Sequence, residues 1–216
     1  MDKENRAERR GSPSSNYEKV LEHWRRKFLT WDAAALCEKA GIHDYDEDSI
    51  RLLYFGIPHR IDRKTGRITC PEKPDYEPGF DEIMAVYSLL YYAKEGAKNS
   101  GEWVHFRDVK DAGVFEAAFE RQVLIPFAKH FSGRTAKFRA AGEALGFLPI
   151  PYGDAAFQVP VFSCIPMRVI FWDGDEDFPA KINLLYDRNV TDFTHAETVV
   201  MLGAECMRYF MEGKEE

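Results

Sequence analysis

The stretch 168-RVIFWDGDEDFPAKINLLYD-187 contains two apolar runs on either side of a short acidic segment. Runs rich in Val, Ile, Phe and Leu are typical of β-strands, and an almost wholly apolar run such as MRVIFW is expected of a central strand covered on both faces. Asp173-Gly174 favours a tight hairpin turn with positive φ. The stretch therefore predicts two paired antiparallel strands, with Phe178 folding back onto the core.

The acidic segment between the runs has two interpretations. Its four acids, Asp173, Asp175, Glu176 and Asp177, could bind a cation or act as acid and base, because carboxylates do both. Three of them match the first positions of a calcium loop, but the glycine and the final glutamate that such a loop needs are absent. We expect the solvated tip of a hairpin, and a carboxylate-based enzyme site is the alternative.

No familiar catalytic or nucleotide-binding motif supports a more specific activity. The chain has no G-x-x-x-x-G-K-[ST], G-x-G-x-x-G, H-E-x-x-H or G-x-S-x-G. Whether the protein is an enzyme stays open, and no catalytic residue is assigned. An arginine or a histidine in a strand could orient an anionic substrate beside the acids. The ligand-binding candidates are Asp173, Asp175, Glu176, Asp177, Arg168 and His59.

Outward from the hairpin, strands and helices occur in blocks rather than in strict alternation. This arrangement predicts an α+β fold, an antiparallel or mixed sheet with helices packed on it. We expect a mobile tail over 1–14 and a single α+β domain over 15–216. Helices are predicted over 16–41, 80–96, 114–131, 135–146 and 195–213, and strands over 49–56, 58–62, 67–70, 102–106, 157–162, 167–172 and 181–187.

Local signals refine several of these boundaries. Asp32 and Gly41 are suited to cap a short helix at its two ends. Pro126 should kink or break its helix, and Pro160 should confine its strand to an edge or a bulge. Thr194-His195-Ala196-Glu197 has the T-x-x-E pattern of a capping box, which predicts that Thr194 caps the last helix.

Composition excludes some classes of partner. The 216 residues carry a net charge of −7, which disfavours binding to nucleic acid or to anionic membranes. No run approaches the roughly 20 apolar residues of a membrane span, and the first residues lack the apolar core of a secretion signal. We therefore expect a cytoplasmic protein without nucleic-acid or membrane partners.

The four cysteines are far apart in the sequence. Zinc and iron–sulfur sites usually include a closely spaced pair, because neighbouring ligands lower the entropy cost of closing the site. Since no such pair is present, we expect free thiols, and no metal or other cofactor in this chain. The cysteines are Cys37, Cys70, Cys164 and Cys206.

Several phrases in order resemble one known family over roughly residues 17–212. They include LLYFGIPHRIDRKTGRI, IMAVYSLLYYAKEG, GEWVHFRDV, GDAAFQVPVFSCIPM and WDGDEDFPAKINLLYD, followed by an H-x-E helix start. The family is the bacterial and archaeal one labelled domain of unknown function 3786. The resemblance implies no established activity. It does imply an origin mostly in anaerobes, where some members look fused to a four-cysteine iron–sulfur domain like that of corrinoid proteins.

Three hypotheses of function follow. The first is an accessory or ligand-binding protein in anaerobic corrinoid, iron–sulfur or one-carbon metabolism. Because the iron–sulfur domain is absent here, a protein partner would carry the cluster or corrinoid. The second is an enzyme with a carboxylate-based site around Asp173–Asp177. The third is a protein–protein adaptor that uses an aromatic surface.

Overall fold

The computed structural model describes residues 13–213 and has the expected α+β architecture. The tail expected over 1–14 lies outside the described residues, apart from Pro13 and Ser14 at the start of the first helix. The first half of the chain forms α1 (Pro13–Phe28), α2 (Ala33–Ala40), β1 (Ser49–Tyr54), β2 (Ile57–Asp62), β3 (Ile68–Thr69) and α3 (Phe80–Tyr92). The second half forms β4 (Trp103–His105), α4 (Glu116–Phe119), α5 (Ile125–Phe131), α6 (Thr135–Ala144), β5 (Leu148–Pro149), β6 (Ala155–Phe162), β7 (Ile165–Trp172), β8 (Lys181–Asp187) and α7 (Ala196–Glu212).

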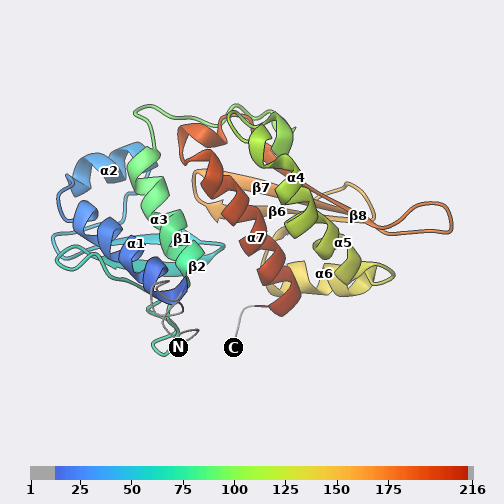
Figure 1. Cartoon of the computed structure of the whole chain (residues 1–216), viewed down its shortest axis with the longest axis horizontal. Helices are drawn as coiled ribbons and strands as arrows, with labels where there is room; N and C mark the ends of the chain where they lie inside the picture. Colours follow the sequence, from blue (N-terminus) through green and yellow to red (C-terminus); the bar gives the residue numbers. More distant parts are fainter. Residues whose placement is uncertain (1–12, 214–216) are drawn as a thin grey trace, which may run out of the picture.

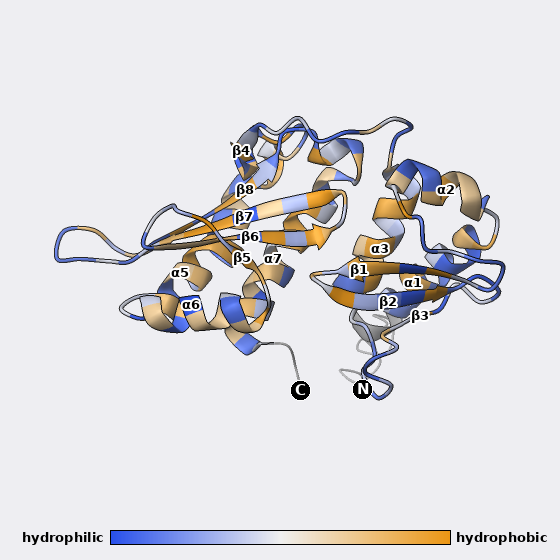
Figure 2. Cartoon of the chain, turned by 180° about the vertical axis from the view of Figure 1, so that it is seen from behind, coloured by the Kyte–Doolittle hydropathy of each residue, from blue (hydrophilic) through white to orange (hydrophobic). Residues whose placement is uncertain are grey.

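Two antiparallel sheets organise these elements. The smaller sheet has the order β1-β2-β3 and the larger the order β4-β8-β7-β6-β5. Figure 1 shows α1, α2 and α3 beside the smaller sheet, and α4, α5, α6 and α7 in front of the larger one. Seen from behind, the strands of the larger sheet lie in front of α5, α6 and α7, so these helices cover only one of its faces (Figure 2).

The two halves share one continuous hydrophobic core. The turn after β1 joins the larger sheet directly, because the Phe55 N–H donates to the Val161 carbonyl at 2.9 Å. The ring of Tyr54 contacts that of Phe162, with 5.0 Å between centroids. β1 therefore packs against the larger sheet, and its partner β2 carries part of the site described below.

The β7–β8 hairpin is confirmed, but its tip differs from the expectation. Trp172 pairs with Lys181, so residues 173–180 form a long loop, and Gly174 does not have positive φ. The prediction of a tight turn at Asp173-Gly174 is therefore wrong. Phe178 is 72% exposed and does not fold back onto the core. The physical reason is that Asp173 binds another part of the chain instead of closing a tight turn.

That other partner is the connection between α5 and α6. The Asp173 carboxylate accepts the Gly133 N–H at 2.7 Å and the Thr135 hydroxyl at 2.7 Å. Asp175 then closes a local turn by accepting the N–H groups of Asp177 and Phe178 at 2.9 and 2.8 Å. Two of the four acids thus hold the shape of the loop.

Most of the local signals are confirmed. Asp32 accepts the Ala34 N–H at 3.0 Å, and Gly41 ends α2 with φ of 65°. Pro126 stands in the first turn of α5, directly after a π-helical turn over Glu120–Leu124. Pro160 lies at a register shift in the β6–β7 pairing. Among the described residues, no helix is both long and apolar enough to cross a membrane.

The predicted capping box at the last helix is wrong. The N-cap of α7 is His195, whose Nδ1 accepts the Glu197 N–H at 3.3 Å. Thr194 is buried, and its hydroxyl shares a hydrogen bond of 2.8 Å with Ser88, which bonds Thr198 at 2.8 Å. Because a threonine hydroxyl buried between helices has no water to bond, the Ser88 contact takes precedence over the cap.

This difference gives a stability prediction. Thr194→Val should lower the free energy of unfolding by about 1–3 kcal/mol, since it removes one member of a buried hydrogen-bond chain. Glu197→Ala should change it by about 0.5 kcal/mol or less, because Glu197 is exposed and makes no capping-box bond. Urea denaturation measures both variants, and a larger loss for Glu197→Ala would restore the capping box.

Candidate functional site

Three chemically reactive side chains meet inside the protein. His59, Cys70 and Glu82 are each 1% exposed and come from three different elements. His59 is on β2, Cys70 follows β3, and Glu82 is in the first turn of α3. Burial of charged groups is costly unless they are paired, so their meeting needs a specific chemical reason.

Local structure brings each of the three inward. In β2, His59 and Ile61 share the buried face, and Cys70 lies two positions beyond the buried Ile68. Glu82 turns back to the start of α3, where its Oε2 accepts the Gly79 N–H at 3.2 Å. The free N–H groups and the dipole at a helix start stabilise a carboxylate there.

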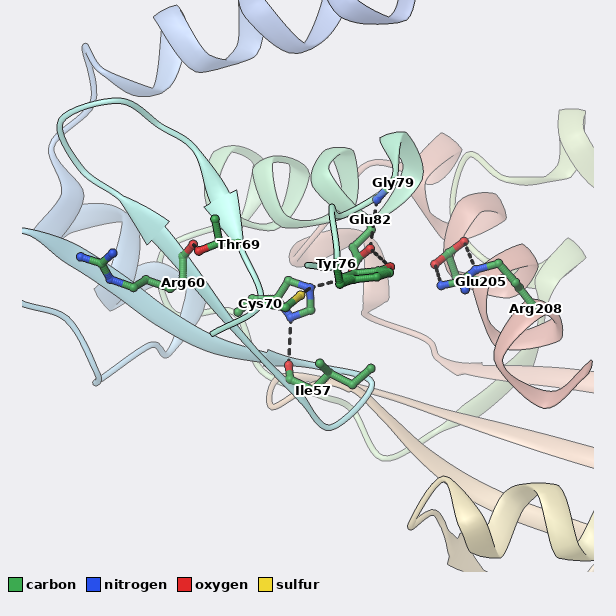
Figure 3. A network of polar contacts seen from close by, with 10 residues as sticks. Ile57, Arg60, Thr69, Cys70, Tyr76, Gly79, Glu82, Glu205 and Arg208 are labelled. Carbon is green, nitrogen blue, oxygen red and sulfur yellow. Dashed lines mark hydrogen bonds and ion pairs between the residues drawn. The ribbon is translucent and has the colours of Figure 1, made fainter. Parts of the chain in front are cut away.

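The polar atoms converge on one ring nitrogen. His59 Nε2 lies 2.5 Å from Glu82 Oε1 and 3.3 Å from Cys70 Sγ. The Tyr76 hydroxyl donates to Glu82 Oε2 at 2.7 Å (Figure 3). On the other side of the imidazole, Nδ1 lies 2.9 Å from the Ile57 carbonyl oxygen.

These contacts determine where the imidazole carries its hydrogens. A carbonyl oxygen only accepts, so Nδ1 carries a hydrogen that it donates to Ile57. Nε2 then faces a carboxylate and a sulfur, both of which attract a positive centre. This position suits a proton, which makes His59 a cation, or a metal ion.

The pKa values show how strongly the site favours a positive charge. Burial alone would lower the pKa of His59, but the hydrogen bonds with Cys70 and Glu82 outweigh it and raise that pKa to about 10. Burial would raise the pKa of Glu82, but the hydrogen bonds from His59 and Tyr76 lower it overall. Without a metal, the site is a buried imidazolium–carboxylate pair.

The same atoms form a donor set for a metal ion. His59, Cys70 and Glu82 each offer one ligand atom, and these atoms lie within 4.8 Å of one another. Among the residues that the structure describes, these three form the one group of at least three side chains that could hold a metal ion. The Nδ1 bond to Ile57 and the Tyr76 bond to Glu82 are of the kind that orients metal ligands in proteins.

A cysteine–histidine nucleophile does not match this geometry. In catalytic triads one ring nitrogen contacts the nucleophile and the other contacts the acid. Here Nε2 contacts both Cys70 and Glu82, and Nδ1 is used by Ile57. Cys70 is also fully buried and lines none of the clefts described below.

Comparison with known proteins agrees with the sequence resemblance. The model of one protein family, described as "Domain of unknown function (DUF3786)", matches residues 32–209. The chain belongs to this family. No curated protein and no solved structure matches it. His59, Cys70, Tyr76 and Glu82 all lie within the segment that matches the family.

The candidates predicted from the sequence do not converge on one place. His59 is in the buried site of the smaller sheet. Arg168 is on β7 of the larger sheet, where its guanidinium carbon lies 4.0 Å from the centre of the Trp103 ring. The acids Asp173, Asp175, Glu176 and Asp177 are in the loop after β7. Their role in ligand binding stays a prediction.

Sequence reasoning missed Cys70, Tyr76 and Glu82. Cys70 and Glu82 stand 11 and 23 positions from His59, so no short motif connects them. One signal was present. In IPHRID, His59 occupies the position that alternates with Ile57 and Ile61, which marks a polar residue on the inward face of a strand.

Proposed function

We propose that this member of the family is a metal-binding protein. His59 Nε2, Cys70 Sγ and the Glu82 carboxylate would hold one divalent transition-metal ion. One observation supports this most strongly: Nε2 faces a carboxylate and a sulfur while Nδ1 is fixed by a backbone carbonyl. A metal ion in place of the proton satisfies all three groups.

The donor set indicates the class of metal. A thiolate disfavours magnesium and calcium, whereas mixed imidazole, thiolate and carboxylate ligands suit zinc and its neighbours in the first transition series. Ligand atoms about 2.0–2.3 Å from a tetrahedral zinc lie roughly 3.3–3.8 Å apart. The Cys70–His59 separation of 3.3 Å lies at the lower end of this range, and the His59–Glu82 separation of 2.5 Å would have to lengthen by about 1 Å.

Three protein ligands leave one position for a water molecule or a substrate, the number found in catalytic zinc sites. The accessory role beside an iron–sulfur or corrinoid partner, the carboxylate enzyme around Asp173–Asp177 and the adaptor stay hypotheses from the sequence. A cytoplasmic location also stays a prediction from the sequence.

Cobalt spectroscopy tests the proposal. Metal-free protein titrated with Co²⁺ should develop a thiolate-to-cobalt charge-transfer band that saturates at about one equivalent. Cys70→Ser should lose the band, because the sulfur ligand is gone. Cys164→Ser is the matched control, since Cys164 is a free thiol that is not one of the three donors, and it should keep the band.

Two results would contradict the proposal. One is a wild-type protein without a saturable band, which would leave His59 and Glu82 as a proton-held ion pair. The other is equal loss in both cysteine variants. Circular dichroism checks that Cys70→Ser is folded, and Glu82→Gln, which keeps the sulfur, should retain a band with weaker affinity.

A further inference from the structure

Two clefts flank the buried site. One, of about 640 Å³, is lined by Glu82 and Tyr76 together with Glu77, Asp81, Glu205 and Arg208; we call it the acidic cleft. The other, of about 670 Å³, is lined by His59 together with Asp44, Arg51, Glu72 and Cys164; we call it the His59 cleft. Each cleft thus touches a different ligand of the proposed metal ion.

The charges of the two clefts differ. Glu205 in the acidic cleft is paired with Arg208 at 2.9 Å (Figure 3). Glu77 has only an exposed contact of 3.4 Å with Arg67, and Asp81 has no hydrogen bond or ion pair with the described side chains. In the His59 cleft, Arg51 holds Asp44 at 2.7 Å. The acidic cleft therefore has the larger surplus of negative charge.

Two buried hydroxyls, which do not line the acidic cleft, are influenced by the charges of its carboxylates. Those of Tyr54 and Tyr209 are buried and have no hydrogen-bond partner among the described residues. Burial raises the pKa of Tyr209, and so do the charges of Glu82 and Glu205 from the cleft wall. Burial and the charge of Glu205 also raise the pKa of Tyr54.

The ring of Tyr54 also packs against that of His59, with 5.7 Å between the ring centroids. Buried hydroxyls without protein partners usually bond water or a ligand. A hydrated cation carries water molecules that such hydroxyls can bond.

We propose that divalent cations reach His59, Cys70 and Glu82 through the acidic cleft, where Glu77 and Asp81 concentrate them. The inference rests on the proposed metal binding and adds the route by which the ion reaches its ligands. A cleft lined by one sign of charge raises the local concentration of the opposite ion and its association rate. Glu82 lines the cleft and belongs to the donor set, so a cation there is already beside its first ligand.

Stopped-flow measurement of Co²⁺ association at low ionic strength tests the route. The double variant Glu77→Gln/Asp81→Asn should bind one Co²⁺ with an unchanged band, but roughly 3- to 10-fold more slowly than wild type. Glu72→Gln/Glu176→Gln is the matched control. It also removes two negative charges, one of them from the His59 cleft, and its rate should stay near that of wild type. Added salt should reduce the difference.

The outcomes separate the route from the metal centre. A normal band with equal rates in both double variants would overturn the acidic route alone. A slower rate only in the Glu72→Gln/Glu176→Gln variant would also overturn it and assign the route to the His59 cleft. Absence of a band in wild-type protein would overturn the metal centre and the route together.

Discussion

Replacing His59 with alanine should lower the free energy of unfolding of the metal-free protein by about 3–5 kcal/mol. The loss is large because Glu82 would remain buried without its positive partner, and Tyr76 and Gly79 supply only two neutral hydrogen bonds. Removing one member of a buried ion pair costs more than the pair itself contributes, since the uncompensated charge must stay out of water.

Denaturation in the presence of a chelator measures this effect. His23→Ala is the matched control, because His23 is an exposed histidine on α1, and it should change the free energy by about 0.5 kcal/mol or less. An equally small loss for His59→Ala would mean that the two groups are neutral in the folded protein, with the proton shared differently from the pair described above.

The effect should depend on pH with a definite sign. The pKa of His59 rises from 6.5 to about 10 on folding, so its contribution is complete below pH 6.5 and is lost as the pH rises towards 10. The pKa of Glu82 is lowered from 4.5, so its contribution is present above that pH and is lost as the pH falls below it. The difference in free energy of unfolding between wild type and His59→Ala should therefore be largest between about pH 4.5 and pH 6.5.

The sequence was informative wherever neighbouring residues determine the structure. Alternating or continuous apolar runs predicted the strands, and Asp32, Gly41 and Pro126 predicted helix boundaries, because each acts on backbone within a few residues of itself. The errors arose where a distant partner competes with a local one. Thr194 bonds Ser88 instead of capping α7, and Asp173 bonds Gly133 and Thr135 instead of forming a tight turn.

The candidate site could not be predicted from the sequence for the same reason. Nothing near His59 in the chain shows that Cys70 and Glu82 will lie beside it, since the smaller sheet and the start of α3 bring them together only in three dimensions. The absence of a close cysteine pair also pointed away from a metal. Closely spaced ligands make a site cheaper to close, but strands and a helix that are already folded can position three separate ligands equally well.

A bound metal ion should raise the stability of the wild-type protein by about 4 kcal/mol when its free concentration is about a thousandfold above its dissociation constant. The reason is linkage: an ion that binds the folded chain and not the unfolded chain shifts the equilibrium towards the folded one. Residual affinity of unfolded cysteine and histidine would reduce the gain. Thermal unfolding with increasing Zn²⁺ should therefore show a saturable rise in Tm.

The Zn²⁺-dependent rise in Tm should require the buried donors and not the acidic loop. Cys70→Ser should lose most of the Zn²⁺-dependent rise, whereas Cys164→Ser should keep it. Asp175→Asn/Asp177→Asn should also keep it, because Asp175 accepts backbone N–H groups within its own loop, as an asparagine oxygen can. If the loop variant loses the rise and Cys70→Ser keeps it, the metal binds at the β7–β8 hairpin. His59 and Glu82 would then be an ion pair that stabilises the fold without a metal.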